Sequence, residues 1–200
     1  MAISEICTRA LLSTINQPTL NKMILNCFKS IIWILFGIIT LHCAPALANK
    51  VQLGQLCPLI SGQWQGSAAN PNGLSKQVTT SVLCSADNSN MYISISQGAR
   101  FSNSETWWFR VRGNEIELIY SDGINADISQ LFTLYQQGDG YTFLGKGEIK
   151  QRPALIRLSF DAQQANGKTH WLWQQSAHFL DDDSDSYQVV RGVSLMPIGR

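Results

Sequence analysis

Apolar and polar residues alternate with a period of two along most of the chain beyond residue 75. In residues 91–97, for example, Met91, Ile93 and Ile95 alternate with one tyrosine and two serines. Successive side chains of a β-strand point to opposite sides, so this period is typical of a strand with one buried face. No segment there shows the helical period of about 3.6 residues. The pattern therefore predicts an all-β fold.

The strand candidates are short and are separated by turn signals. A first strand begins near Trp64, and others follow at residues 76–85, 91–97, 106–112, 115–121, 129–136, 141–150, 154–160, 170–176 and 187–195. Short strands joined by pairs such as Gly113-Asn114 are typical of hairpins. Gly145 and Gly147 indicate a bend or bulge within one strand. We expect an antiparallel up-and-down β-barrel of about 8 to 10 strands, with a β-sandwich as the alternative.

The first quarter of the chain has the features of a signal peptide. Lys29 precedes an uncharged apolar run at residues 31–41, and Ala46-Leu47-Ala48 is the small-x-small pattern that signal peptidase accepts. We predict cleavage after Ala48, so that residues 49–200 form a single domain in the periplasm or outside the cell. Translation from Met23 would give this leader a conventional length.

Two other interpretations of the leader stay open. The apolar run could be an uncleaved anchor, although it is shorter than the roughly 20 apolar residues that cross a bilayer. Cys43 could be the lipidated cysteine of a lipoprotein, but His42 stands where a small residue is expected. After cleavage we expect no association with a membrane.

Cysteine usage is consistent with export. Of the five cysteines, Cys57 and Cys84 are the two that lie beyond the predicted leader. In an oxidising compartment such a pair typically forms a disulfide bond, which contributes roughly 3 kcal/mol to stability. A metal-binding pair is the alternative, but the chain has no Cys-x-x-Cys motif, and neither cysteine lies near a histidine in the sequence. We expect a disulfide bond, no metal site and no cofactor.

Charge and motifs disfavour several classes of function. The chain carries 15 Lys and Arg against 14 Asp and Glu and has no basic stripe, which argues against a nucleic-acid partner. His170 and His178 accompany no Gly-x-Ser-x-Gly motif. The acidic run at residues 181–185 lacks the glycine and the distal glutamate of a calcium-binding loop, so a solvated hairpin tip is the better interpretation. We therefore expect a protein that is not an enzyme.

The segment Gly62-Gln63-Trp64 at the start of the strands, with Arg191 on the last strand, resembles the calycin group of lipocalin-like and avidin-like barrels. In lipocalins the tryptophan of the first strand packs under a basic residue. The resemblance therefore implies a cation–π contact between Arg191 and Trp64, worth about 0.5–2 kcal/mol. The lipocalin Thr-Asp-Tyr motif is missing between them.

Residues 168–172 also look like the avidin strand that carries a tryptophan of the biotin site. Gln65 and Gly66 stand where that site would have polar residues, and Phe179 stands where it would have an asparagine. These departures argue against biotin as the ligand. What the calycin resemblance implies is the barrel architecture and a function in binding.

Aromatic residues provide the candidates for a ligand site. A barrel of this size holds about one small molecule, and binding lumens are mostly apolar and aromatic with a few polar anchors. We expect the lumen to be lined by Trp107, Phe109, Tyr120, Tyr141, Phe143 and Trp171, with Arg157 as an inward polar anchor. The alternative is that the same rings fill a closed core.

These observations predict an exported, non-catalytic, calycin-like barrel that binds a small hydrophobic or amphipathic ligand in its lumen. The alternative is a periplasmic inhibitor or interaction protein that acts on an exported hydrolase through its outer surface or a loop. Trp108, beside Arg110 and Arg112 on the opposite face of residues 106–112, is the kind of aromatic and basic patch that such a contact uses.

Overall fold

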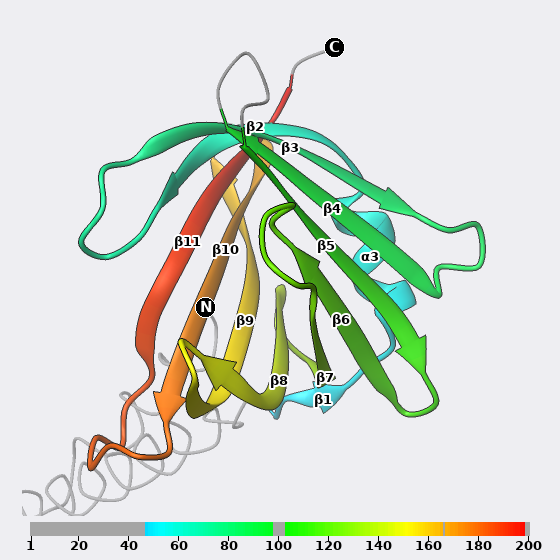
Figure 1. Cartoon of the computed structure of the whole chain (residues 1–200). Coiled ribbons are helices and arrows are strands. Elements are labelled where there is room, and N and C mark those ends of the chain that lie inside the picture. The colour runs from blue at the N-terminus through cyan, green and yellow to red at the C-terminus, as the bar shows by residue number, and fades with distance from the viewer. Residues whose placement is uncertain (1–46, 98–102, 166, 199–200) are drawn as a thin grey trace, which may run out of the picture. The chain divides into compact units, whose positions relative to one another are not determined.

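The alternating segments form a closed antiparallel β-barrel (Figure 1). The structure is a computed structural model that describes residues 47–97, 103–165 and 167–198. One compact unit runs from Ala46 to Arg200. Met23, Cys43 and nearly all of the predicted signal peptide lie outside the described residues, so the leader and its cleavage stay predictions.

One short helix precedes the barrel strands, which follow one another through short connections. In chain order the elements are β1 (Asn49–Lys50), α3 (Leu53–Ile60), β2 (Gly62–Ala69), β3 (Lys76–Cys84), β4 (Asn90–Gln97), β5 (Asn103–Arg112), β6 (Glu115–Ser121), β7 (Ile128–Gln137), β8 (Gly140–Ile149), β9 (Arg152–Ala165), β10 (Lys168–Phe179) and β11 (Gln188–Pro197).

The barrel closes because its first and last strands pair with each other. Every strand from β2 to β11 pairs antiparallel with the next one in the sequence, and β11 pairs with β2 from Pro197 opposite Trp64 to Gly192 opposite Ala69. The short strand β1 adds to β7. The prediction of an all-β, up-and-down antiparallel barrel is therefore confirmed.

Connections in an up-and-down barrel alternate between its two ends. The end that we name the helix end carries α3 and the turns at residues 85–89, 113–114 and 138–139. The opposite end, named the loop end, carries the connections at residues 70–75, 122–127, 150–151 and 180–187. Along β5 the side chains alternate as predicted, because Trp107 and Phe109 are buried inside and Arg112 is exposed outside.

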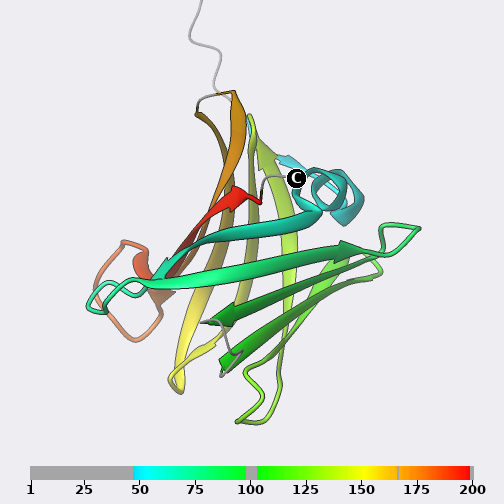
Figure 2. The ribbon, with the colours of Figure 1, turned by 90° about the horizontal axis from the view of Figure 1, so that it is seen from above.

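The helix was not predicted from the sequence. The buried residues of α3 follow the i, i+3, i+4, i+7 spacing of one helical face and are Leu53, Leu56, Cys57 and Ile60. Pro58 obscures this pattern, because proline is disfavoured within a helix. The chain passes from α3 directly into β2 (Figure 2). Among the described residues, no helix is long and apolar enough to cross a membrane.

Contacts on two sides hold α3 at the helix end. Cys57 forms a disulfide bond with Cys84 at the end of β3, and their Cα atoms are 6.0 Å apart. From β8, the Tyr141 hydroxyl donates a hydrogen bond to the backbone carbonyl of Gln55 at 3.4 Å. The predicted disulfide bond is thus present, and it fastens the helix to the barrel wall.

The barrel wall opens between β7 and β8 toward the loop end. Their ladder stops at the pair Phe132 and Gly145. Beyond this pair, residues 128–131 of β7 pair with β6 and residues 146–149 of β8 pair with β9, but not with each other.

Two glycines lie where atoms of β7 approach the backbone of β8 at the edge of this opening. A Cβ atom at Gly145 would overlap the backbone carbonyl of Leu131, and one at Gly147 would overlap the side-chain amide of Gln130. A bend or bulge was expected at these glycines. The ladder between β8 and β9 runs through both without a register shift, whereas the ladder between β7 and β8 ends at Gly145.

Gly66 offers a test of the pairing that closes the barrel. It lies opposite Leu195, and a Cβ atom at this position would overlap the backbone carbonyl of Ser194. We expect Gly66→Ala to force β2 and β11 apart and to lower the free energy of unfolding by about 3 kcal/mol or more, measured by chemical denaturation. The control is Gly113→Asn, at a turn with φ of 60° and no heavy atom within 4 Å of a Cβ, which should be nearly neutral. Wild-type stability of Gly66→Ala would contradict the register.

Candidate functional site

Aromatic rings fill the centre of the barrel. The ring centroids of Phe109 and Phe143 are 4.8 Å apart, those of Phe143 and Phe160 are 5.7 Å apart, and those of Phe160 and Trp173 are 6.0 Å apart. These are the distances of aromatic pairs in contact. Because the rings come from β5, β8, β9 and β10, they meet across the interior. A ligand site is therefore to be sought nearer one end of the barrel.

All but one of the predicted lining residues face the interior. Trp107, Phe109, Tyr141, Phe143 and Trp171 are buried, and Tyr120 is half-buried against the same core. Trp107 joins two of them, with its ring centroid 6.4 Å from that of Phe109 and 5.1 Å from that of Tyr120. Their role in binding a ligand stays a prediction.

Arg157 is the exception, because it lies on the outer face of β9. Its neighbours Ile156 and Leu158 are buried inside, so strand alternation turns Arg157 outward. Its Nε donates a hydrogen bond to Ser176 Oγ at 3.0 Å, and its guanidinium lies 4.5 Å from the ring centre of Tyr187. The expected inward anchor is therefore not Arg157.

Among the arginines of the part of the chain that the structure describes, Arg191 points into the barrel. It comes from β11, yet its guanidinium carbon lies 4.6 Å from the ring centre of Trp107 on β5 and 5.1 Å from that of Tyr120 on β6. The Trp173 ring lies at 5.8 Å. Cation–π contacts with such rings are worth about 0.5–2 kcal/mol each. Arg191 therefore crosses the interior near the loop end.

The contact between Arg191 and Trp64 that the calycin resemblance implied is not made. Trp64 lies opposite Pro197, whereas Arg191 lies beyond the pair formed by Gly192 and Ala69. The two residues are thus near opposite ends of the barrel. Trp64 packs at the helix end, where its indole N–H donates to the backbone carbonyl of Ile60 at 2.8 Å. Gly62 has a φ of 136°, which favours glycine at this entry to β2.

Glu105 and Gln175 complete a group that we name the polar bridge, which consists of Glu105, Gln175 and Arg191. Arg191 Nη1 donates to Glu105 Oε2, and Arg191 Nε donates to Gln175 Oε1, both at 2.7 Å. The side chains of Arg191 and Glu105 are only 22% and 24% exposed. Charges withdrawn from water need such partners. The bridge joins β10 and β11 to β5 and covers the aromatic core.

The rings beneath the polar bridge carry hydrogen-bond donors. The indole nitrogens of Trp107 and Trp173 are buried and have no hydrogen-bond partner. An unpaired buried donor costs about 1–3 kcal/mol. Burial raises the pKa of Tyr120 and outweighs the opposite effect of Arg191, so the phenol stays protonated. The surroundings of the bridge are therefore rich in donors.

A small hollow adjoins the polar bridge on the side of β2, β3 and β4. Its volume is about 170 Å³, and Glu105, Arg191 and Trp173 contribute to its lining. The apolar part of the lining includes Ala68, Ile95 and Val193. Its polar part includes Asn70, Lys76 and Gln97 besides the charged pair. Apolar contact combined with polar anchors is typical of a small-molecule site.

A larger hollow lies on the other side, toward the opening between β7 and β8. Its volume is about 1330 Å³, and it extends from Tyr120 to Gln130 and Gly147. Outer-surface residues such as Lys146 also line it, so this hollow communicates with solvent through the wall. Its lining includes Tyr120, whose ring contacts Arg191, but none of the three residues of the polar bridge.

Glu105, Gln175 and Trp173 were not predicted to be site residues from the sequence. A signal for Glu105 was present, because it shares the period of two with Trp107 and Phe109 and therefore their inward face. No signal in the sequence indicated that Glu105 would meet Arg191.

The predicted aromatic and basic patch exists on the outer face. Leu83, Tyr92 and Trp108 lie side by side across β3, β4 and β5. The rings of Tyr92 and Trp108 stack with centroids 5.5 Å apart, and Arg110 lies 4.7 Å above Trp108. Leu83 and Tyr92 are 60% and 40% exposed. This row is the surface to which the alternative function refers.

Glu117 balances the positive charge of this outer patch. Nε of Arg110 and Nε of Arg112 each donate to Glu117 Oε2 at 2.7 Å, and Ser129 Oγ donates to Glu117 Oε1 at 2.7 Å. These hydrogen bonds, foremost that from Arg110, lower the pKa of Glu117 from 4.5 to about 2.

The lowered pKa of Glu117 predicts a pH-dependent contribution to stability. The ionised carboxylate stabilises the fold above about pH 4.5, and this contribution is lost as the pH falls toward about 2. We expect Glu117→Gln to lower Tm by a few degrees at pH 7, and the difference from wild type to shrink between these limits in thermal scans followed by circular dichroism. Glu115→Gln controls for the loss of one negative charge on the same strand. A Tm difference for Glu117→Gln that does not vary with pH would contradict this account.

Comparison with known proteins assigns no family to this chain. No protein-family description matches it, and no curated protein sequence matches it. The barrel is consistent with the calycin resemblance in architecture. The function proposed for the chain therefore depends on the geometry of the polar bridge and of the small hollow beside it.

Proposed function

We propose that this barrel binds a small amphipathic molecule at its loop end, around the polar bridge. The observation that carries the proposal is Arg191, a charged side chain held across the barrel by three aromatic rings at the edge of a small hollow. Such a site offers a ligand both apolar surface and a fixed charge. It is also accessible, since the side chains of Arg191 and Glu105 keep part of their surface exposed to solvent.

The proposed site lies between the centre of the barrel and its loop end. The contacts among Phe109, Phe143 and Phe160 occupy that centre, and α3 covers the helix end. A ligand that entered more deeply would have to separate close-packed rings, which is costly in a well-packed core. The loop end requires no such rearrangement.

The proposal is for a binding protein without a catalytic step. The polar bridge supplies charge, hydrogen-bond donors and apolar walls, which hold and orient a molecule but pair no nucleophile with a base. We also propose that the protein acts in the periplasm or outside the cell. The disulfide bond between Cys57 and Cys84 supports this placement, because such bonds persist in oxidising compartments.

The second candidate is a contact with another protein, such as an exported hydrolase, through the outer face. The exposure of Leu83 and Tyr92 beside Trp108 favours it, since aromatic side chains flanked by arginine are typical of protein interfaces. The two candidates use opposite faces of the same wall. Substitutions on one face therefore separate them.

Tryptophan fluorescence tests the first proposal. We expect titration with medium-chain amphiphiles to change the emission of the folded protein saturably, because Trp107 and Trp173 lie beneath the polar bridge. Trp107→Phe and Trp173→Phe should each remove a large part of the response while retaining an aromatic ring in the core. The control Trp108→Phe, on the outer face, should respond as wild type does. Loss of the response in Trp108→Phe alone would favour the outer-surface candidate.

A further inference from the structure

We propose that the ligand carries a carboxylate and that Glu105 occupies the place of this carboxylate when the site is empty. The inference builds on the proposed function, because it names the chemical class of the molecule bound at the polar bridge. Its elements are the hydrogen-bonding capacity of Arg191, the unpaired donors beneath it, and the position of Glu105 at the edge of a hollow.

The guanidinium of Arg191 is fixed in an orientation that can bind a planar anion. Its Nε bond to Gln175 and the ring faces of Trp107 and Tyr120 fix the guanidinium within the barrel. The contact between Nη1 and Glu105 shows which kind of group this orientation accepts. A guanidinium presents a fork of donors that matches a carboxylate. The ligand group best suited to Arg191 is therefore the group that already bonds to it.

The unpaired donors favour an anionic ligand over a cationic one. Trp107 and Trp173 are 2% and 3% exposed, and the indole nitrogen of each lacks an acceptor. Trp173 also lines the small hollow. A ligand with oxygen acceptors can add a partner for the Trp173 donor at this hollow, whereas a cation adds none and is repelled by Arg191.

Glu105 is placed so that it can leave Arg191. It lies near the start of β5 at the loop end, and its side chain keeps some exposure to solvent. When no ligand is bound, Glu105 prevents Arg191 from remaining unpaired away from water, which is a costly state. When a ligand carboxylate replaces it, Glu105 can turn to solvent. Glu105 therefore acts as a built-in competitor that lowers affinity.

The small hollow limits the size of the ligand. Its volume of about 170 Å³ is below the range of about 300–1000 Å³ that is usual for drug-sized molecules. Ala68, Ile95 and Val193 in its lining offer apolar contact next to the charged pair. We therefore assign a compact monocarboxylate with a short apolar body as the ligand class.

Three probes of equal chain length test the charge preference: hexanoate, 1-hexanol and hexyltrimethylammonium. Binding to the whole protein is measured by isothermal titration calorimetry and by tryptophan fluorescence at one ionic strength. We expect hexanoate to bind more tightly than the alcohol, and the ammonium compound to bind least. The alcohol controls for the apolar contribution alone.

Glu105→Gln is the decisive variant, because it keeps the shape of the side chain and removes its charge. We expect it to bind hexanoate about tenfold more tightly than wild type does and to change the affinity for hexanol little. Arg191→Gln should abolish the preference for hexanoate over hexanol. Arg191→Lys keeps the charge without the fork and should bind hexanoate with intermediate affinity.

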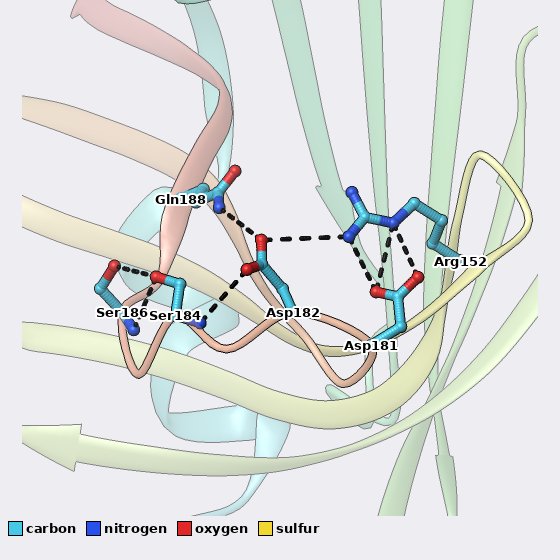
Figure 3. A network of polar contacts seen from close by, with 6 residues as sticks. All are labelled: Arg152, Asp181, Asp182, Ser184, Ser186 and Gln188. Atoms are coloured by element: carbon cyan, nitrogen blue, oxygen red, sulfur yellow. Dashed lines mark hydrogen bonds and ion pairs between the residues drawn. The ribbon is translucent and has the colours of Figure 1, made fainter.

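An ion pair on the outer surface provides the matched control. Arg152 donates from Nη2 to Asp181 Oδ1 at 2.8 Å and lies 4.0 Å from the ring centre of Phe179 (Figure 3 shows the ion pair). Like Arg191, it combines a carboxylate with an aromatic ring, but it lines neither hollow. Arg152→Gln and Asp181→Asn should leave hexanoate binding within about twofold of wild type.

The outcomes distinguish a failure of the carboxylate assignment from a failure of the proposed binding function. Tighter binding of hexanol or of the ammonium probe than of hexanoate, or no gain in Glu105→Gln, would overturn the carboxylate assignment and leave the binding function intact. Failure of all three probes to bind folded wild type and folded Glu105→Gln would overturn the binding function itself. Circular dichroism of each variant establishes that it is folded, and Glu105→Gln answers the question even where an Arg191 variant does not fold.

Discussion

The closed wall of the barrel limits the space inside it. The packing of inward side chains into this space determines where a ligand site can lie. The number of strands sets the diameter, so inward side chains must match a limited cross-section. Phenylalanine and tryptophan rings fill the centre, and α3 with its disulfide bond covers the helix end. The layer nearest the loop end departs from this apolar packing by placing the charged pair Arg191 and Glu105 inside the barrel. The chemistry of the site is therefore confined to one layer.

The guanidinium of Arg191 holds that layer together, because it is largely withdrawn from water and binds side chains of several strands. Arg191 extends from β11 to the opposite wall and needs both ring faces and oxygen partners to remain there. Glu105 and Gln175 supply the oxygens from β5 and β10. The bridge thus links the neighbouring strands β10 and β11 to β5, with which neither of them pairs, and it borders the small hollow beside β2.

The strands and their inward faces could be predicted from the sequence, because both depend on local alternation. The alternation of side chains along a strand correctly predicted that Trp107 and Phe109 face the interior and that Arg110 faces outward. It did not reveal α3, whose apolar spacing is short and interrupted by Pro58, nor did it identify the partner of any inward residue. Glu105 and Arg191 meet across 86 positions of sequence, and only the closed barrel brings them together. Local patterns establish which face a side chain occupies, whereas the partners of that side chain depend on strand order and register.

The polar bridge is difficult to explain as a device for stability. Replacing a sequestered ion pair by well-packed apolar side chains is often neutral or stabilising, and the buried indole nitrogens of Trp107 and Trp173 add unpaired donors directly beneath it. A barrel under no other constraint would continue its apolar packing into this layer, as it does around Phe143 and Phe160. Local rules of packing and polar pairing are most often broken at functional sites. The energetic cost of this layer is thus itself an argument that the loop end serves to bind a molecule.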